Sequence, residues 1–114
     1  MSNILNVCSH LPDRFTCFDR FLVYKFTCNL CSNFYIGETS RAFKCRYNEH
    51  NRSLTNKDEK SALSCHAKAV HSSLEVTIKD FDLKILSHWK TPVETRLAES
   101  RAIDRYRPSL NRKF

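Results

Sequence analysis

The stretch FTCNLCSNFYIGETSRAFKCRYNEH, residues 26–50, contains the only glycine of the chain and three of its six cysteines. The run LVYKFTC (22–28) is rich in β-branched and aromatic residues, and FYIG (34–37) follows it. These two runs predict a hairpin whose turn is CNLCSN. Because this turn has neither glycine nor proline, we expect a metal ion bound to Cys28 and Cys31 to impose it.

Beyond the hairpin, the pattern changes from strand to helix. A helix capped by Thr39 or Ser40 is predicted through RAFKCRYNEHNRS. The polar residues 51–60 predict a loop, and SALSCHAKAVH, which begins at Ser61, predicts a second, shorter helix.

The second half of the chain predicts a strand and a final helix. Apolar and polar residues alternate over 81–89, which indicates a third strand, and similar alternation at 74–78 allows an earlier start. Thr91, Pro92 and Glu94 occupy the cap, first and third positions of a helix over TPVETRLAESRAIDRY. Pro108 ends this helix, and a basic tail follows.

Length and composition indicate one globular domain. The 114 residues are 41% hydrophobic and carry a net charge of +7, which favours an acidic partner such as nucleic acid. No apolar run approaches the roughly 20 residues of a membrane span, and no secretory signal is evident. We therefore expect no membrane partner and an intracellular, nuclear location. Residues 1–20 lack a sustained period and are interpreted as a loose lead-in to a domain over 21–114.

The spacing of cysteines and histidines predicts a structural zinc site. Intracellular thiols stay reduced, so paired cysteines there are more often metal ligands than disulfides. Cys28-x2-Cys31 and His66-x4-His71 both have spacings found in Cys₂His₂ zinc sites. Residues five apart on a helix point about 140° away from each other, so the helix must end between the two histidines. The long gap between the pairs predicts a staple that joins the hairpin to a distant helix.

Two alternatives to this ligand set remain open. Cys65, adjacent to His66, is the substitute ligand, and six cysteines also permit a disulfide-rich secreted domain. The sequence assigns no role to Cys8, Cys17 or Cys45.

Two short motifs point to a known family. LVY (22–24) and YIG (35–37) resemble the signature of the GIY-YIG nuclease family. The family is expected to place an arginine and, one turn later, a histidine on the next helix, then a glutamate on a later helix and an asparagine near the domain end. The matching residues are Arg46, His50, Glu99 and Asn111. The resemblance implies an α+β fold with a small three-stranded antiparallel sheet flanked by about three helices.

Within this family the chain most resembles the endonuclease domain of Penelope-like retrotransposons. The shared features are YIGETSR, the CxxC between the two tyrosine motifs, and the paired histidines that follow. Such elements fuse the nuclease to a reverse transcriptase, which is therefore an expected partner domain in the parent element. Leu22 replaces the first glycine of the family signature. This change leaves open a second interpretation, a catalytically inactive, zinc-stabilised module that only binds nucleic acid.

The resemblance implies a metal-dependent DNA endonuclease, and the residue types suit that chemistry. Glu99 can bind Mg²⁺ or Mn²⁺ and is expected at the edge of a buried stripe of Val93, Leu97 and Ile103 on the last helix. Arg46 can bind phosphate through its planar fork. Tyr24 and Tyr35 could order or deprotonate water, and His50 could relay the proton. Non-specific contacts to the DNA backbone are expected from Arg41, Lys44, Arg107, Arg112 and Lys113.

Overall fold

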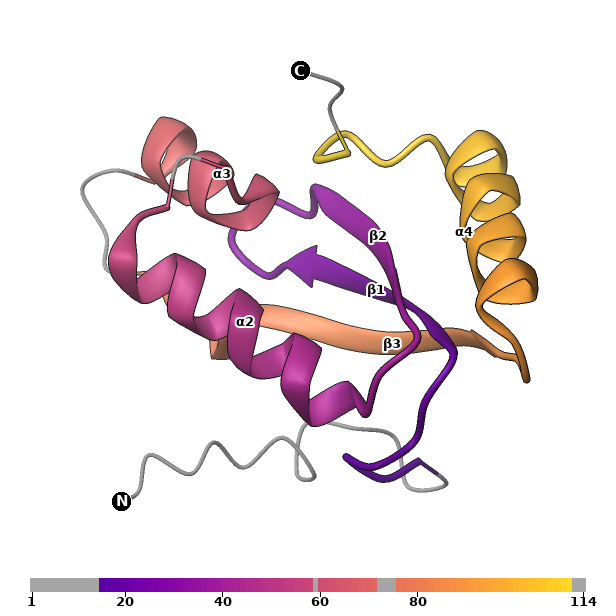
Figure 1. Cartoon of the computed structure of the whole chain (residues 1–114). Coiled ribbons are helices and arrows are strands. Elements are labelled where there is room, and N and C mark those ends of the chain that lie inside the picture. Colours follow the sequence, from indigo (N-terminus) through magenta and orange to yellow (C-terminus); the bar gives the residue numbers. More distant parts are fainter. Residues whose placement is uncertain (1–14, 59, 72–75, 112–114) are drawn as a thin grey trace.

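The computed structural model describes residues 15–58, 60–71 and 76–111. The elements are β1 (Leu22–Cys28), β2 (Phe34–Thr39), α2 (Phe43–Asn56), α3 (Ala62–Val70), the 3₁₀ turn η1 (Ile78–Asp80), β3 (Phe81–His88) and α4 (Pro92–Tyr106). The strands form one antiparallel sheet in the order β2-β1-β3 (Figure 1). The predicted α+β architecture, with three antiparallel strands and flanking helices, is confirmed. In the part of the chain just defined, no helix has the length and apolar character to span a membrane.

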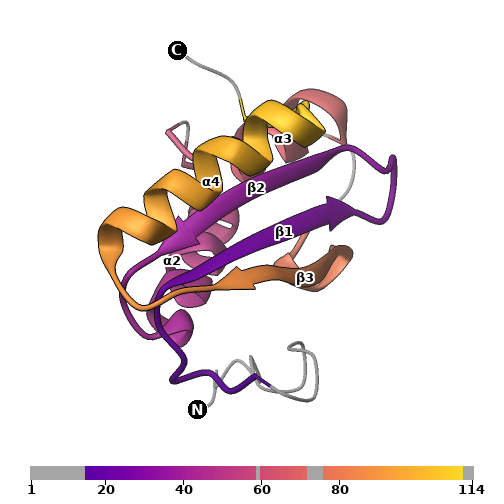
Figure 2. The ribbon, with the colours of Figure 1, turned by 90° about the vertical axis from the view of Figure 1, so that its right-hand side faces the viewer.

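Helices cover both faces of the sheet. Figure 2 shows α4 in front of the sheet, crossing β2, with α2 behind it. On the α2 side, side chains of β1 pack edge-on or tilted against helix residues: Tyr24 against Phe43, and Phe26 against Tyr47. These four aromatic side chains are fully buried. Because β1 is the central strand, it is buried on both faces. Its sequence is therefore mostly apolar and does not alternate strictly between apolar and polar residues.

The start of α2 differs from the prediction. A cap at Thr39 or Ser40 is wrong, since the helix begins at Phe43 without a side-chain cap. Instead, the first N–H groups, those of Phe43 and Lys44, donate to carbonyl oxygens of the segment 15–20, at 2.9 and 2.8 Å. Main-chain oxygens of a segment distant in sequence thus satisfy the free N–H groups of the helix start. The sequence around residue 43 cannot reveal such a contact.

The end of α2 also differs. The predicted loop over 51–60 is wrong for residues 51–56, which continue the helix. Leu54 is buried and anchors this extra turn against the core. Lys57 then adopts a left-handed conformation (φ 56°), and its N–H donates to the Leu54 carbonyl. This is the conformation in which many helices end, here without the usual glycine.

The third strand and the last helix begin close to the predicted positions. β3 starts at Phe81, and residues 78–80 form η1, so an earlier strand start is wrong there; residues 74 and 75 lie outside the described residues. Thr91 caps α4, and its Oγ1 accepts from the Glu94 N–H at 3.2 Å. The Glu94 carboxylate accepts from the N–H of Lys90 at 3.3 Å, one residue before the cap.

The inner face of α4 differs from the predicted stripe of Val93, Leu97 and Ile103. Val93 and Leu97 are 65% and 49% exposed. Thr95 is fully buried instead, and its hydroxyl donates to the Thr91 carbonyl at 2.7 Å. The partly buried residues that continue this face are Ala98, Glu99, Ala102 and Ile103. Glu99 therefore lies within the face that packs on the sheet, and not at its edge.

Candidate active site

The single glycine is required by a close side-chain approach. Gly37 does not have a positive φ, so backbone freedom is not the reason for it. A Cβ atom at this position would lie 2.6 Å from Oη of Tyr24 and 2.8 Å from Cε2 of Tyr35. Real Cβ atoms do not approach other atoms so closely. Gly37 therefore lets both tyrosine rings gather at this point of β2.

A buried hydrogen-bonded cluster joins Tyr24 to α2. Its Oη accepts from Nε of Arg46 at 3.1 Å and lies 2.8 Å from Nε2 of His50. A guanidinium has only donors, so the phenol oxygen accepts from Arg46, and the tautomer of the His50 ring sets the direction of the second bond.

Burial keeps both partners in this bond uncharged. The His50 ring packs edge-on against Tyr24, Phe26 and Tyr35. Burial, together with the charge of Arg46, lowers the pKa of His50 to about 3. Burial likewise raises the pKa of Tyr24 well above its ordinary value. Both groups are therefore neutral near pH 7.

A cleft of about 530 Å³ lies beside this cluster. Tyr35, Arg46, His50 and Asn111 line it, whereas Tyr24 is fully buried beneath its surface. Burial raises the pKa of Tyr35, although the neighbouring Arg46 opposes the rise. Burial also favours the neutral form of Arg46, but the two tyrosines outweigh it and raise the pKa of Arg46, which stays charged.

Glu99 lies within electrostatic range of the same groups. Its negative charge raises the pKa of both Tyr24 and Tyr35, and Arg46 in turn stabilises the ionised form of Glu99. Burial first, and then the charge of Glu38, raise the pKa of Glu99 to about 6. The carboxylate, both phenols and the guanidinium thus come together from α4, the sheet and α2.

Glu38 is a site residue that the sequence interpretation missed. Its Oε1 is buried and has no hydrogen-bond partner among the described residues. A buried oxygen without a partner next to a second carboxylate fits a divalent cation, which prefers oxygen ligands. The available signal was an acidic residue near the end of an otherwise uncharged strand.

Asn111 fastens the end of the domain to the sheet. Its Oδ1 accepts from the N–H of Ile36 at 2.7 Å, and its Nδ2 donates to the Ile36 carbonyl at 2.6 Å. The N–H of Leu110 donates to the carbonyl of Phe34 at 3.1 Å. Because β2 is an edge strand, this segment satisfies main-chain groups that no fourth strand pairs with.

The predicted basic contacts that the structure describes lie around the start of α2 and at the end of α4. Arg41 forms an ion pair with Glu49 at 2.7 Å, and Lys44 places Nζ 4.9 Å from the centre of the Phe18 ring. Arg107 ends α4 in a left-handed conformation and is exposed. Arg112 and Lys113 lie outside the described residues.

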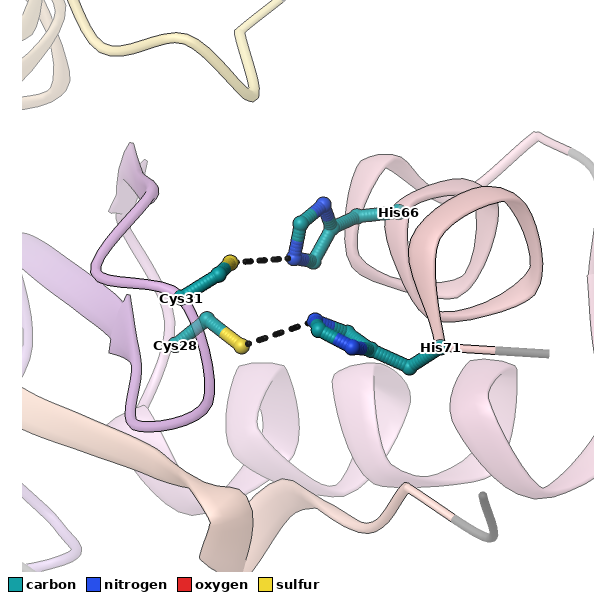
Figure 3. Close-up of side chains that lie close together, drawn as sticks. All are labelled: Cys28, Cys31, His66 and His71. Carbon is teal, nitrogen blue, oxygen red and sulfur yellow. Dashed lines mark hydrogen bonds between the residues drawn. The ribbon is translucent and has the colours of Figure 1, made fainter. Parts of the chain in front are cut away.

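The predicted zinc ligands meet at the far end of the hairpin. Figure 3 shows the cysteines on the β1–β2 turn facing the histidines of α3 and its C-terminal end. Sγ of Cys31 lies 3.2 Å from Nε2 of His66, and Sγ of Cys28 lies 3.6 Å from Nε2 of His71. The helix ends at Val70, between the two histidines, as predicted.

This group could hold a zinc ion. The ligand atoms of Cys28, Cys31, His66 and His71 all lie within 4.8 Å of one another, which suits a tetrahedral site with bonds of about 2.0–2.3 Å. Burial alone would raise the pKa of Cys31, but hydrogen bonds, including one from the Asn33 main chain, lower it to about 7.

The two alternative uses of the cysteines find no support. Cys65, the alternative ligand, is not part of the Cys₂His₂ group. No disulfide joins any two of the cysteines that the structure describes.

An antiparallel sheet beside a cleft lined by a tyrosine and an arginine, with a glutamate within electrostatic range of both, has the residue types of a nuclease domain. The GIY-YIG catalytic domain profile matches residues 20–113, and the chain belongs to this family. Its members are nucleases, so the substrate class is nucleic acid. No curated protein and no solved structure matches the chain significantly.

Proposed function

We propose that the protein is a metal-dependent endonuclease that hydrolyses phosphodiester bonds of DNA. The observation that carries this proposal is that Tyr35 and Arg46 line one cleft and that Glu99 lies within electrostatic range of both. Hydrolysis of a phosphodiester requires an activated water and stabilisation of charge on the phosphoryl oxygens. These three residue types supply groups for both tasks.

The residues divide these tasks according to their burial. Glu99, with Glu38 beside it, would hold Mg²⁺ or Mn²⁺, which supplies charge neutralisation and a polarised water when bound. Arg46 binds a phosphoryl oxygen with the donors that it directs toward the cleft. Tyr35 lines the cleft and contacts the attacking water, whereas the buried Tyr24 holds the guanidinium of Arg46.

The remaining predicted site residues act through others. His50 holds the ring of Tyr24 in place through the hydrogen bond between Nε2 and the Tyr24 hydroxyl. Asn111 fixes the edge of β2, which carries Tyr35. The Cys₂His₂ group binds zinc and ties the hairpin to α3, with a structural role. Arg41, Lys44 and Arg107 contact the DNA backbone.

A Penelope-like retroelement is the proposed origin. The support is sequence similarity alone: YIGETSR at 35–41, the CxxC between the tyrosine motifs, and the histidines at 66 and 71. This origin implies a reverse transcriptase in the parent element and a nuclear site of action.

The second candidate function is an inactive module that binds nucleic acid. It is favoured by Leu22, which stands where the family signature has glycine. Leu22 is fully buried in the core and pairs with Thr39 across the hairpin. The replacement is thus accommodated by the fold, and only activity distinguishes the two candidates.

Nicking of supercoiled plasmid in Mg²⁺ or Mn²⁺ tests the proposal. We expect the wild-type protein to nick and Glu99→Gln to lose at least about 100-fold in rate, as expected for an essential charged group. Asp104→Asn, which removes an exposed charge from the same helix, is the control and should nick normally. DNA binding without nicking by the wild-type protein would favour the inactive module instead.

A further inference from the structure

We propose that Glu49 is a positioning residue that joins Arg41 and Arg46 into one phosphate-binding unit at the mouth of the cleft. The inference rests on the proposed nuclease function and adds a residue that neither the family signature nor the sequence pattern identified. Glu49 lines the cleft beside Arg46.

One carboxylate contacts both guanidinium groups. Oε1 of Glu49 accepts from Nη1 of Arg46 at 3.1 Å and from Nη2 of Arg41 at 2.8 Å. Oε2 accepts from the same Nη2 of Arg41 at 2.7 Å. Two like-charged side chains repel each other, so a shared carboxylate is what allows them to lie close together. The three side chains retain one net positive charge.

The backbone brings the three residues to one place. Arg46 and Glu49 are three residues apart on α2 and so lie on the same helix face. Arg41 lies just before the helix, where its N–H donates to Oγ1 of Thr39 at 3.1 Å. This bond fixes the loop that presents Arg41 to Glu49.

The guanidinium of Arg46 forms two hydrogen bonds within the protein and keeps further N–H donors for a ligand. Its Nε donates to Tyr24 and its Nη1 to Glu49, so rotation about the end of the side chain is restricted. A guanidinium carries five N–H donors, so each arginine keeps donors beyond those bonded to Tyr24 and Glu49. These are the donors that a phosphate could engage, and the Arg41 guanidinium further lowers the pKa of Glu49, which keeps its charge.

If Glu49 only formed a surface ion pair with Arg41, the expected results would differ. The Arg41 and Glu49 side chains are 57% and 37% exposed, and exposed ion pairs contribute little to stability. If Glu49 had only that role, its replacement would leave the reaction rate unchanged. It would also strengthen DNA binding, since a negative charge is lost.

Steady-state nicking of plasmid by Glu49→Gln separates these outcomes. The positioning role predicts that kcat falls by about 10- to 100-fold while KM for DNA does not rise, because the arginines lose their fixed arrangement but keep their charge. Asp104→Asn removes one charge without touching the cleft and should retain the wild-type kcat. A kcat for Glu49→Gln equal to that of Asp104→Asn would overturn the inference.

Nuclear magnetic resonance of the side-chain Nη1–H groups of Arg46, which donate to Glu49, gives an answer that does not depend on activity. In the wild-type protein this signal should be resolved and slow to exchange, and in Glu49→Gln it should move to the position of free arginine. An unchanged Arg46 signal in Glu49→Gln would contradict the positioning role. If the wild-type protein does not cleave DNA, the proposed function fails, and this spectrum still decides the role of Glu49.

Discussion

At residue 37, the absence of a side chain determines where two phenols lie. Oη and Cζ of Tyr24 would be 2.6 and 2.7 Å from any Cβ there, and the ring of Tyr24 is fully buried. The ring cannot move away without breaking its bonds to Arg46 and His50. The sequence alone identified this glycine as unusual, but only the packing explains it.

Gly37→Ala is therefore expected to destabilise the fold by about 1–3 kcal/mol, the usual cost of adding a carbon to a packed core. Urea unfolding monitored by circular dichroism measures this free energy. Ser100→Ala, an exposed change on α4, serves as a control and should alter stability by less than about 0.5 kcal/mol. Equal stability of the Gly37→Ala and wild-type proteins would show that Tyr24 does not occupy the position described.

His50 gives a pH dependence with a defined sign. Its pKa is lowered to about 3 in the folded protein, against about 6.5 for an unfolded histidine. The unfolded chain therefore binds a proton first, and stability falls as pH decreases from about 6.5 toward 3, by up to about 1.4 kcal/mol per pH unit.

The test compares the free energy of unfolding at pH 7 and pH 5. We expect the loss to be smaller in His50→Gln than in the wild-type protein, while His88→Gln, which changes an exposed histidine, keeps the wild-type loss. Zinc release at low pH affects all three proteins and cancels in the comparison. The same loss in His50→Gln would mean that His50 is already protonated near neutral pH.

Among the elements, the β1–β2 turn is the one that a bound zinc ion would stabilise most directly. Ser32 adopts a left-handed conformation (φ 68°) in this turn, which is unfavourable for a residue other than glycine. The turn sequence CNLCSN has neither glycine nor proline to stabilise the bend. Bound zinc would compensate for that cost, because metal binding energy contributes directly to folding in small sites.

Removal of zinc is expected to lower the melting temperature of the domain by at least about 10 °C or to unfold it, since a structural zinc binds strongly. Metal analysis should find one zinc per chain in the wild-type protein and little in Cys31→Ser. Cys65→Ser, next to ligand His66 but outside the group, is the matched control and should retain zinc. An unchanged melting temperature after complete removal of zinc would refute its structural role.

Elements with strong local signals were predictable from the sequence, and those that depend on distant contacts were not. The hairpin, the Thr91 cap and the Cys₂His₂ spacing are each encoded within a few residues. The start of α2 depends on carbonyl groups of residues 15–20, and the inner face of α4 contains Thr95 and Glu99 instead of Val93 and Leu97. The prediction assumed that apolar residues form the inner face of α4. It was wrong because this face meets the candidate active site, which requires polar groups.

At the scale of the whole molecule, the sheet connects two separate sites. The β1–β2 turn carries the two cysteines of the candidate zinc site, and the strands of the same hairpin carry Tyr24, Tyr35 and Gly37. The candidate site also needs side chains from α2 and α4, on opposite faces of the sheet (Figure 2). Family order predicted which residues would meet, but Glu38 and Glu49 belong to no short motif and became visible only through their neighbours.

The central claim is that Glu99 and the cleft with Tyr35 and Arg46 form one site, and a crystal structure with Mn²⁺ tests it most directly. We predict an anomalous scattering peak at bonding distance from a Glu99 carboxylate oxygen, on the side that faces Tyr35 and Arg46, and no peak there in Glu99→Gln crystals. A Mn²⁺ peak elsewhere, or a Glu99 side chain turned away from both tyrosines, would contradict the account.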